Sequence, residues 1–305
     1  MHRYLTLLPL MCVTAYFVAG LIAFSVRTWR RGLPVDPEVA GRPASPLLGR
    51  YLRHYIMWVL APYERTLVRL HITPNVLTLA SLATAIGAGV ALGLGAFAVG
   101  GWLYLLAGIL DILDGRVARA TGRVTRGGAF FDSVIDRYAE IAVFAGLAFY
   151  YRSTWVLAAV LLAAMGSVMV SYVRARGEAL GVDVKIGTMQ RPERLLYLGA
   201  ILAHSPLWEA LRPSAGRPMF PPAIAALVLL GLSANVTAVR RIVHTLRKLD
   251  EQPAEAGAAL ATPLSPPAAT AEIPGVAVPV DGAATRRPAG ATGSRPLLAR
   301  PRPIG

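Results

Sequence analysis

Charged residues are scarce in this chain of 305 residues: Asp, Glu, Lys and Arg make up only 16% of it, whereas hydrophobic residues make up 55%. A soluble domain carries about a quarter charged residues, so the composition excludes an ordinary soluble globular protein. The mean hydropathy of +0.51 points the same way. We therefore expect an integral membrane protein built from helices.

Lysine and cysteine are nearly absent. The net charge of +14 comes almost entirely from arginine, because the chain has only two lysines. In a membrane protein such an excess marks cytoplasmic loops and contacts with anionic lipid headgroups, and no nucleic-acid-binding motif accompanies it. The single Cys12 excludes an intrachain disulfide, and we expect it to have a packing role.

Residues 4–26 form an apolar run long enough to span a bilayer. A cleaved signal peptide is the alternative, but the run is long for one and no clear cleavage site follows. The basic residues after Arg27 place its C-terminal end in the cytoplasm. Residues 27–45 are rich in Pro and Gly and predict a linker. Residues 46–71 predict an interfacial amphipathic segment broken near Pro62.

Six further apolar segments predict a helical core. The fifth is weaker, since His204 and Pro206 interrupt it. The fold class we expect is an all-α integral membrane protein with a six-helix transmembrane core, an extra N-terminal transmembrane helix and an interfacial amphipathic helix. The six segments are residues 76–98, 101–119, 128–150, 154–173, 195–211 and 219–239.

The distribution of arginine predicts a topology of seven spans with Met1 outside and the tail inside. The tail itself is rich in Ala and Pro without periodic apolar residues, so we expect it to be disordered. The predicted domains are the anchor (1–26), the linker and juxtamembrane segment (27–71), the six-helix domain (72–249) and the tail (250–305).

One stretch, residues 111–136, carries acidic side chains between strongly apolar flanks, where they are expensive and usually functional. It reads DILDGRVARATGRVTRGGAFFDSVID. Asp111 and Asp114 share one face of a helix, and Asp132 and Asp136 share a face of the next. Two antiparallel helices then direct four carboxylates into one space.

Four carboxylates so close together cannot all ionise without a counter-charge. Oxygen ligands suit Mg²⁺, Mn²⁺ or Ca²⁺, and two metals bridged by carboxylates stabilise displacement at phosphorus. Gly115 lets a ligand approach the backbone, and Arg119 suits phosphate. The alternative is that these are helix-end charges paired with neighbouring arginines.

The pattern D-x2-D-G-x2-A-R-x8-G-x3-D-x3-D is matched at all eight fixed positions. It resembles the signature of the CDP-alcohol phosphatidyltransferases, membrane enzymes of phospholipid synthesis. The resemblance covers about residues 72–245. It implies a six-helix core, a likeness to bacterial or archaeal cell-membrane enzymes whose active site faces the cytoplasm, and a homodimer. The implied reaction transfers a phosphatidyl group from a CDP-linked lipid, usually CDP-diacylglycerol, to an alcohol and releases CMP.

The resemblance also implies roles for individual residues. Asp136 is the general base on the attacking hydroxyl, and two divalent ions, Mg²⁺ or Mn²⁺, bind at the aspartates. The segment TPNxLT opens the first core helix beside the nucleotide. The metal ligands are Asp111, Asp114, Asp132 and Asp136, and the nucleotide contacts are Asp114, Gly115, Ala118, Arg119, Gly128, Asn75 and Thr78.

The acceptor side rests on a basic loop that directly follows a core span. Guanidinium groups beside a metal site suit an acceptor that carries its own phosphate, and the loop resembles that of the branch that uses inositol 1-phosphate to make phosphatidylinositol phosphate. Headgroup anchoring is the alternative role for these arginines. The predicted acceptor pocket consists of Ser171, Arg174, Arg191 and Arg194.

Other functions fit parts of the pattern. Another acceptor, namely glycerol 3-phosphate, serine or free inositol, leaves the chemistry unchanged. An ion transporter also carries intramembrane aspartates, but here they cluster at one membrane face. A non-catalytic family member acting through interactions is the last alternative, and the intact aspartates speak against it.

Overall fold

The computed structural model describes residues 7–34, 36, 39, 49–184, 186 and 191–251. Within this described part the chain is entirely helical, with eight helices and no strand. The expected fold class is confirmed. The helices are α2 (Leu7–Arg31), α4 (Arg50–Arg69), α5 (Pro74–Gly93), α6 (Phe97–Ala120), α7 (Arg126–Tyr151), α8 (Val156–Ala179), α9 (Arg191–Leu211) and α10 (Pro221–Asp250).

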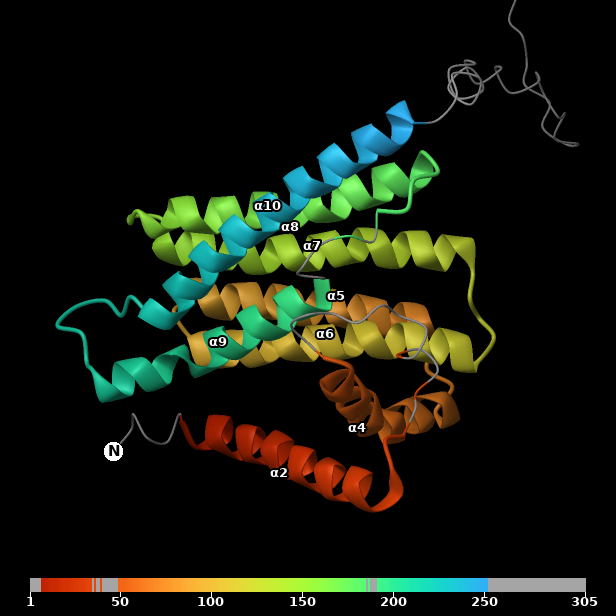
Figure 1. Ribbon diagram of the computed structural model, residues 1–305. Coiled ribbons are helices and arrows are strands. Elements are labelled where there is room, and N and C mark those ends of the chain that lie inside the picture. The colour runs from red at the N-terminus through yellow and green to blue at the C-terminus, as the bar shows by residue number, and fades with distance from the viewer. Residues whose placement is uncertain are drawn as a thin grey trace, which may run out of the picture. The chain divides into compact units, whose positions relative to one another are not determined.

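The six helices α5–α10 run alongside one another as the core (Figure 1). Helix α5 packs against both α6 and α7, α6 packs against α9, and α8 packs against α10. The crossing of α5 and α7 is very close: a Cβ built on Gly146 would meet the backbone of Gly89. Small residues permit this approach, as they commonly do between membrane helices.

Aromatic residues close the bundle at the end where α9 joins α10. The rings of Phe97 and Phe220 stack with centroids 4.1 Å apart. The hydroxyls of Tyr150 and Tyr151 donate to the carbonyl oxygens of Pro218 and Met219, at 2.5 and 2.8 Å. These hydrogen bonds fix the connection to α10, because they satisfy backbone groups that the loop leaves without helical partners.

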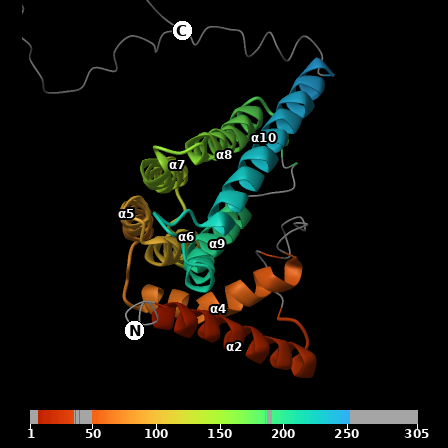
Figure 2. The same ribbon diagram turned by 90° about the vertical axis from the view of Figure 1, so that its left-hand side faces the viewer.

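Helices α2 and α4 lie together beside the core (Figure 2). The Tyr55 hydroxyl of α4 donates to the Phe17 carbonyl of α2 at 2.6 Å, and Phe24 is enclosed by aromatic rings of α4. The predicted break near Pro62 is wrong, since α4 continues through this residue. Helix α9 likewise continues through His204 and Pro206.

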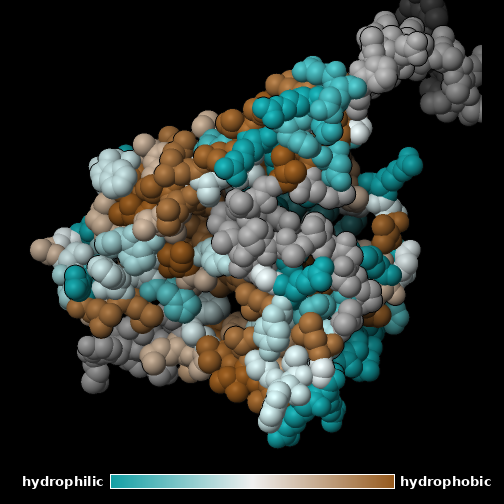
Figure 3. Space-filling view, viewed as in Figure 1, coloured by the Kyte–Doolittle hydropathy of each residue, from teal (hydrophilic) through white to brown (hydrophobic). Residues whose placement is uncertain are grey.

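Five of the described helices are long and apolar enough to cross a membrane: α2, from Met11 onward, α5, α6, α8 and α10. Helices α7 and α9 fall outside this set. Helix α7 carries Asp132 and Asp136, and α9 carries Arg191 and Arg194. Helices α8 and α10 also extend past the predicted spans, to Ala179 and Asp250. On the face shown in Figure 3, hydrophobic residues cover much of the upper left of the core, and many hydrophilic residues lie toward the side where α6 turns into α7 and along the end of α10.

Candidate active site

The turn between α6 and α7 brings the two halves of the acidic motif together. Helix α6 ends at Ala120, and Gly122 adopts a φ of 66° that reverses the chain. The Thr125 side chain then caps α7 by accepting a hydrogen bond from the Gly128 amide at 3.0 Å. The carboxylates of α6 therefore lie opposite those of α7.

Three of the four predicted carboxylates form a compact cluster. One oxygen from each of Asp111, Asp114 and Asp132 lies within 4.8 Å of the others. Asp114 is buried, with 5% of its surface exposed, and its Oδ2 accepts a hydrogen bond from the Thr78 hydroxyl at 2.6 Å. This cluster fits a hard divalent cation, because all its donors are carboxylate oxygens and one of them is already oriented.

The fourth carboxylate, Asp136, is joined to the cluster by an arginine. The Arg191 guanidinium lies 2.5 Å from Asp136 Oδ2 and donates to both carboxylate oxygens of Asp111, at 3.1 and 3.3 Å. Arg191 is the first residue of α9, so this one side chain bridges α6, α7 and α9. The sequence had placed it in the acceptor pocket, apart from the metal ligands.

A second network lies one turn further along α7, and sequence reasoning missed two of its members. Arg194 is only 2% exposed and donates to the Ser167 hydroxyl at 2.8 Å. It also lies 3.6 Å from Glu140, which accepts a short hydrogen bond from Ser167. The spacing 132, 136 and 140 would have indicated Glu140, since residues four apart share one helix face.

Helix α4 is tied to the same region by two ion pairs. Arg116 Nε lies 2.5 Å from Glu64, and its Nη1 lies 3.1 Å from Asp36 in the segment after α2. Arg53 lies 3.6 Å from Glu193, which is fully buried. These contacts hold α4 against both α6 and α9. No sequence signal identifies them, because they join segments far apart in the chain.

The other predicted nucleotide contacts line the same end of α5 and α6. Asn75 is exposed at the start of α5, and Ala118 is half-buried on α6. The Arg119 guanidinium lies over Gly115, where a Cβ would meet its Nη1 at 3.2 Å. The Gly128 amide is engaged in the α7 cap. Gly115, Ala118 and Arg119 thus follow Asp114 on α6, whereas Asn75 and Gly128 lie in the first turns of α5 and α7.

The predicted acceptor residues divide into two groups. Arg191 and Arg194 both lie at the start of α9 beside the carboxylates. Arg174 is exposed on α8 and pairs with Glu178 at 2.9 Å, whereas the Ser171 hydroxyl donates to the Ser167 carbonyl at 3.3 Å. Arg191 contacts the aspartates directly, whereas Arg194 and Ser171 both contact Ser167 of the second network.

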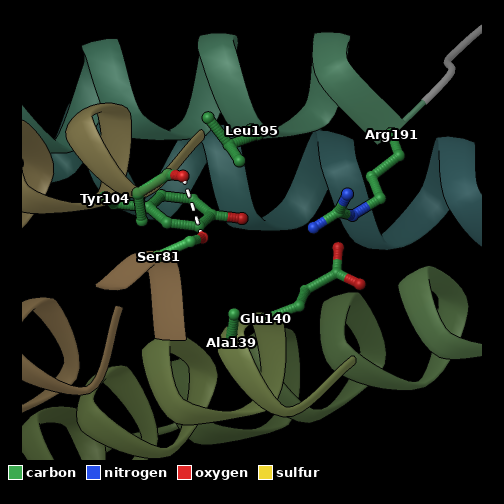
Figure 4. A pocket seen from close by; sticks show the side chains of 7 residues that line it. Ser81, Tyr104, Ala139, Glu140, Arg191 and Leu195 are labelled. Atoms are coloured by element: carbon green, nitrogen blue, oxygen red, sulfur yellow. Dashed lines mark hydrogen bonds between the residues drawn. The ribbon is translucent and has the colours of Figure 1, made fainter. Parts of the chain in front are cut away.

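A pocket opens beside Asp136, between helices α5, α6, α7 and α9 (Figure 4). Arg191 and Glu140 face each other across it, and the Tyr104 ring forms the inner wall. Arg191 therefore belongs both to this pocket and to the carboxylate site. The lining residues are Ser81, Tyr104, Ala107, Ala139, Glu140, Arg191 and Leu195.

The fold and the site define a class: helical membrane proteins with a carboxylate cluster that suits a metal, where two consecutive helices meet. Comparison with known proteins identifies the family within this class. A sequence model of the CDP-alcohol phosphatidyltransferase family matches residues 71–232. The chain belongs to this family.

Relatives within the family are similar over most of their length. The phosphatidylinositol phosphate synthase of Streptomyces avermitilis is 35% identical over 241 residues, which cover 75% of this chain and 95% of that protein. Crystal structures of the phosphatidylinositol phosphate synthase of Mycobacterium tuberculosis, one with CDP-DAG bound and one with manganese and citrate, each align with a TM-score of 0.53 and 29% identity. Each alignment covers 60% of this chain, and 92% and 87% of those chains respectively.

The family assignment sets the class of reaction. The chain is an integral membrane transferase of phospholipid synthesis that moves a phosphatidyl group with CDP-alcohol chemistry. Divalent metal use is consistent with the manganese bound in the relative and with the aspartate cluster here.

Proposed function

We propose that this enzyme transfers the phosphatidyl group of CDP-diacylglycerol to inositol 1-phosphate and releases CMP. The observation that carries the proposal is the Arg191 bridge, which puts a guanidinium 2.5 Å from Asp136, beside the carboxylates that suit a metal. An acceptor that carries its own phosphate needs such a cation next to the reacting centre. The names of the relatives support the same donor and product class.

The donor nucleotide is assigned to the cytoplasmic ends of α5 and α6. Thr78 orients Asp114 through their 2.6 Å hydrogen bond. Gly115 and Ala118 are the proposed contacts on α6, and the exposed Arg119, whose guanidinium lies over Gly115, provides a cation for the pyrophosphate. Asn75 and the Gly128 turn complete the proposed contacts.

The four aspartates Asp111, Asp114, Asp132 and Asp136 are the proposed ligands of two divalent ions, Mg²⁺ or Mn²⁺. Bound ions of this kind offset the charge that develops on a phosphate leaving group. The carboxylates themselves position the ions and keep the donor pyrophosphate in register with the acceptor.

Asp136 is the proposed general base. It accepts the proton of the attacking inositol hydroxyl while that oxygen forms a bond to the phosphorus of the lipid phosphate. The bond from this phosphorus to the CMP oxygen breaks, and CMP leaves with the electron pair. We assign this role to Asp136 because its carboxylate contacts Arg191, which lines the pocket where we expect the acceptor hydroxyl to approach.

The acceptor phosphate is assigned to Arg191 with Arg194, Arg174 and Ser171. Arg194 contacts Ser167 and Glu140, and Glu140 lines the pocket, so Arg194 supports the pocket wall from behind. Arg174 is exposed on α8 and provides a long side chain on the same face of the bundle.

Further assignments follow from the same proposal. The catalytic domain is residues 72–249, preceded by a membrane anchor and a juxtamembrane segment, and the active site faces the cytoplasm. The enzyme works as a homodimer in the membrane. The proposed tail, 250–305, lies almost wholly outside the described residues.

The deciding experiment is a vesicle assay with CDP-diacylglycerol labelled in the cytidine. Purified enzyme is given Mg²⁺ or Mn²⁺ and, in parallel, inositol 1-phosphate, glycerol 3-phosphate, serine or free inositol. We expect CMP release and a phosphorylated lipid product with inositol 1-phosphate only. Turnover with another acceptor alone would overturn the acceptor, and ion flux without CMP release would overturn the enzymatic function.

A further inference from the structure

Arg191 holds oxygens that a metal ion would also need. Its guanidinium contacts Asp136 Oδ2 at 2.5 Å and Asp111 Oδ2 at 3.1 Å. Both aspartates are largely buried, with 18% and 21% of their side-chain surface exposed. A guanidinium presents its N–H groups as a planar fork, so one arginine can serve two carboxylates at once.

These two half-buried carboxylates need a counter-charge whenever both are ionised, since ionised groups away from water are strongly penalised. Arg191 supplies that charge in the arrangement observed here. A divalent cation draws on the same oxygen lone pairs at 2.0–2.6 Å. An oxygen that is fully engaged by a cation at this distance cannot keep its short hydrogen bond to the guanidinium, so the two compete.

We propose that Arg191 is a resident counter-cation of Asp111 and Asp136, and that it releases these carboxylates when a divalent cation binds, becoming available to the acceptor phosphate. Metal loading and acceptor capture are then coupled through one side chain. The release step concerns only the residues named here, whereas the destination of the guanidinium rests on the proposed function.

The surroundings of Arg191 allow this movement and deny it to its neighbour. Arg191 begins α9 and keeps 27% of its side chain exposed, so the side chain is not enclosed on all sides. Arg194, one turn later, is 2% exposed and tied to Ser167 and Glu140. In the observed arrangement Arg191 also faces Glu140 across the pocket (Figure 4). We expect this carboxylate to keep the released guanidinium at the pocket.

The first test measures Mn²⁺ affinity without any substrate, by titration of the full-length protein in detergent. Arg191→Gln removes the competitor and its charge. The dissociation constant of the Mn²⁺ ion that binds Asp111 and Asp136 should therefore fall by roughly 10-fold or more, in line with the loss of charged hydrogen bonds. Arg126→Gln is the matched control. Arg126 is an exposed arginine at the start of α7, the helix that carries Asp132 and Asp136. It should shift the affinity by less than about 2-fold, through weak screened repulsion. Equal or weaker Mn²⁺ binding by Arg191→Gln overturns the proposal.

The second test uses the wild-type protein and does not depend on a variant that folds. Phenylglyoxal labels accessible arginines, and mass spectrometry follows each site separately. Mn²⁺ should accelerate labelling of Arg191 several-fold and leave Arg126 unchanged. If Mn²⁺ slows the labelling of Arg191 or leaves it unchanged, the release step is refuted.

Adding inositol 1-phosphate together with Mn²⁺ then separates the two parts of the idea. Protection of Arg191 supports capture of the acceptor phosphate by the released guanidinium. Faster labelling by Mn²⁺ without such protection keeps the counter-cation role and overturns only the destination. Failure of inositol 1-phosphate in the CMP-release assay is a separate result that concerns the proposed function.

Discussion

Thr78 is a residue whose whole contribution to the site passes through one hydroxyl. It donates to buried Asp114 at 2.6 Å, and thereby fixes which way that carboxylate faces. Thr78→Val keeps the shape but removes the donor. We expect kcat/KM for the CDP-lipid to fall about 10-fold, because a hydrogen bond to a charged group contributes roughly 1.5–3 kcal/mol.

Thr78→Ser is the matched control, since it keeps the hydroxyl and loses only a methyl group. Steady-state kinetics of both variants, together with the Mg²⁺ concentration needed for half-maximal rate, distinguish the cases. If Val and Ser at this position behave alike, the hydrogen bond to Asp114 has no role in the reaction.

Variants at Asp136 and Asp111 distinguish a general base from a residue that only binds metal. Asp136→Asn should reduce the chemical step by several orders of magnitude while donor affinity changes little, because an amide cannot accept the hydroxyl proton. Asp111→Asn should lose turnover together with metal affinity. Single-turnover rates and binding of a CDP-lipid measured in parallel provide the check. Equal loss of donor affinity in both variants would make Asp136 mainly a ligand.

At the residue scale the sequence located the acidic site but not the ion pairs that connect it to α9. Helix geometry puts Asp111 and Asp114 on one face, the turn after α6 sets Asp132 opposite them, and the structure brings these three together. The partners of Arg191 and Arg194 depend on how α9 packs against α6 and α7. Local periodicity carries no information about such a contact between distant segments, so the arginine bridge could not be predicted.

The elements that carry the site are held by close helix crossings. A Cβ built on Gly89 of α5 would lie 2.3 Å from the Ala142 carbonyl oxygen of α7. Gly89→Ala must therefore push apart the helix that carries Thr78 and the helix that carries Asp136. Overpacking of this kind costs about 1–3 kcal/mol, and we expect a lower unfolding temperature in detergent and a loss of activity.

Gly87→Ala is the control on the same helix. Its added Cβ would find Leu103 Cδ1 at 3.7 Å, an ordinary contact. Alanine also favours the helix over glycine by about 1 kcal/mol, so this variant should be as stable as the wild type or more so. If Gly89→Ala matches Gly87→Ala in its unfolding temperature, the α5–α7 crossing is more adaptable than its geometry indicates.

At the element scale the apolar runs gave the number and order of the helices. Their ends were less predictable. Helix α8 continues past the apolar run through Arg174 and Arg176 to Ala179, and α10 continues to Asp250. Hydropathy reports only where a helix meets lipid, whereas its backbone hydrogen bonds extend as long as the residues favour helix. Pro62 and Pro206 did not end their helices for a related reason: neighbouring helices stabilise the turn that a proline weakens.

At the scale of the whole molecule, polar groups of the described helices meet one another within the bundle. Glu193 is fully buried and Arg194 almost so, and they contact residues of α4, α7 and α8. The sequence predicted spans at 128–150 and 195–211, although helices α7 and α9 are more polar than the five most apolar long helices. Several of their charged residues contact neighbouring helices. Intramembrane charges arranged in this way mark a functional interior.

The same charge distribution makes a topological prediction. The turn between α6 and α7 carries the exposed Arg123, whereas Gly216 lies in the exposed connection between α9 and α10 at the opposite end of the bundle. Basic loops stay in the cytoplasm, so the two positions should face opposite compartments.

With native Cys12 replaced by serine, Arg123→Cys and Gly216→Cys each provide a single reporter. A membrane-impermeant maleimide applied to intact cells of a bacterial expression host should label Gly216→Cys and spare Arg123→Cys, and inside-out vesicles should reverse the pattern. Labelling of both from one side would contradict the bundle crossing, and the inverse pattern would place the aspartates outside, where a cytoplasmic CDP-lipid headgroup could not reach them.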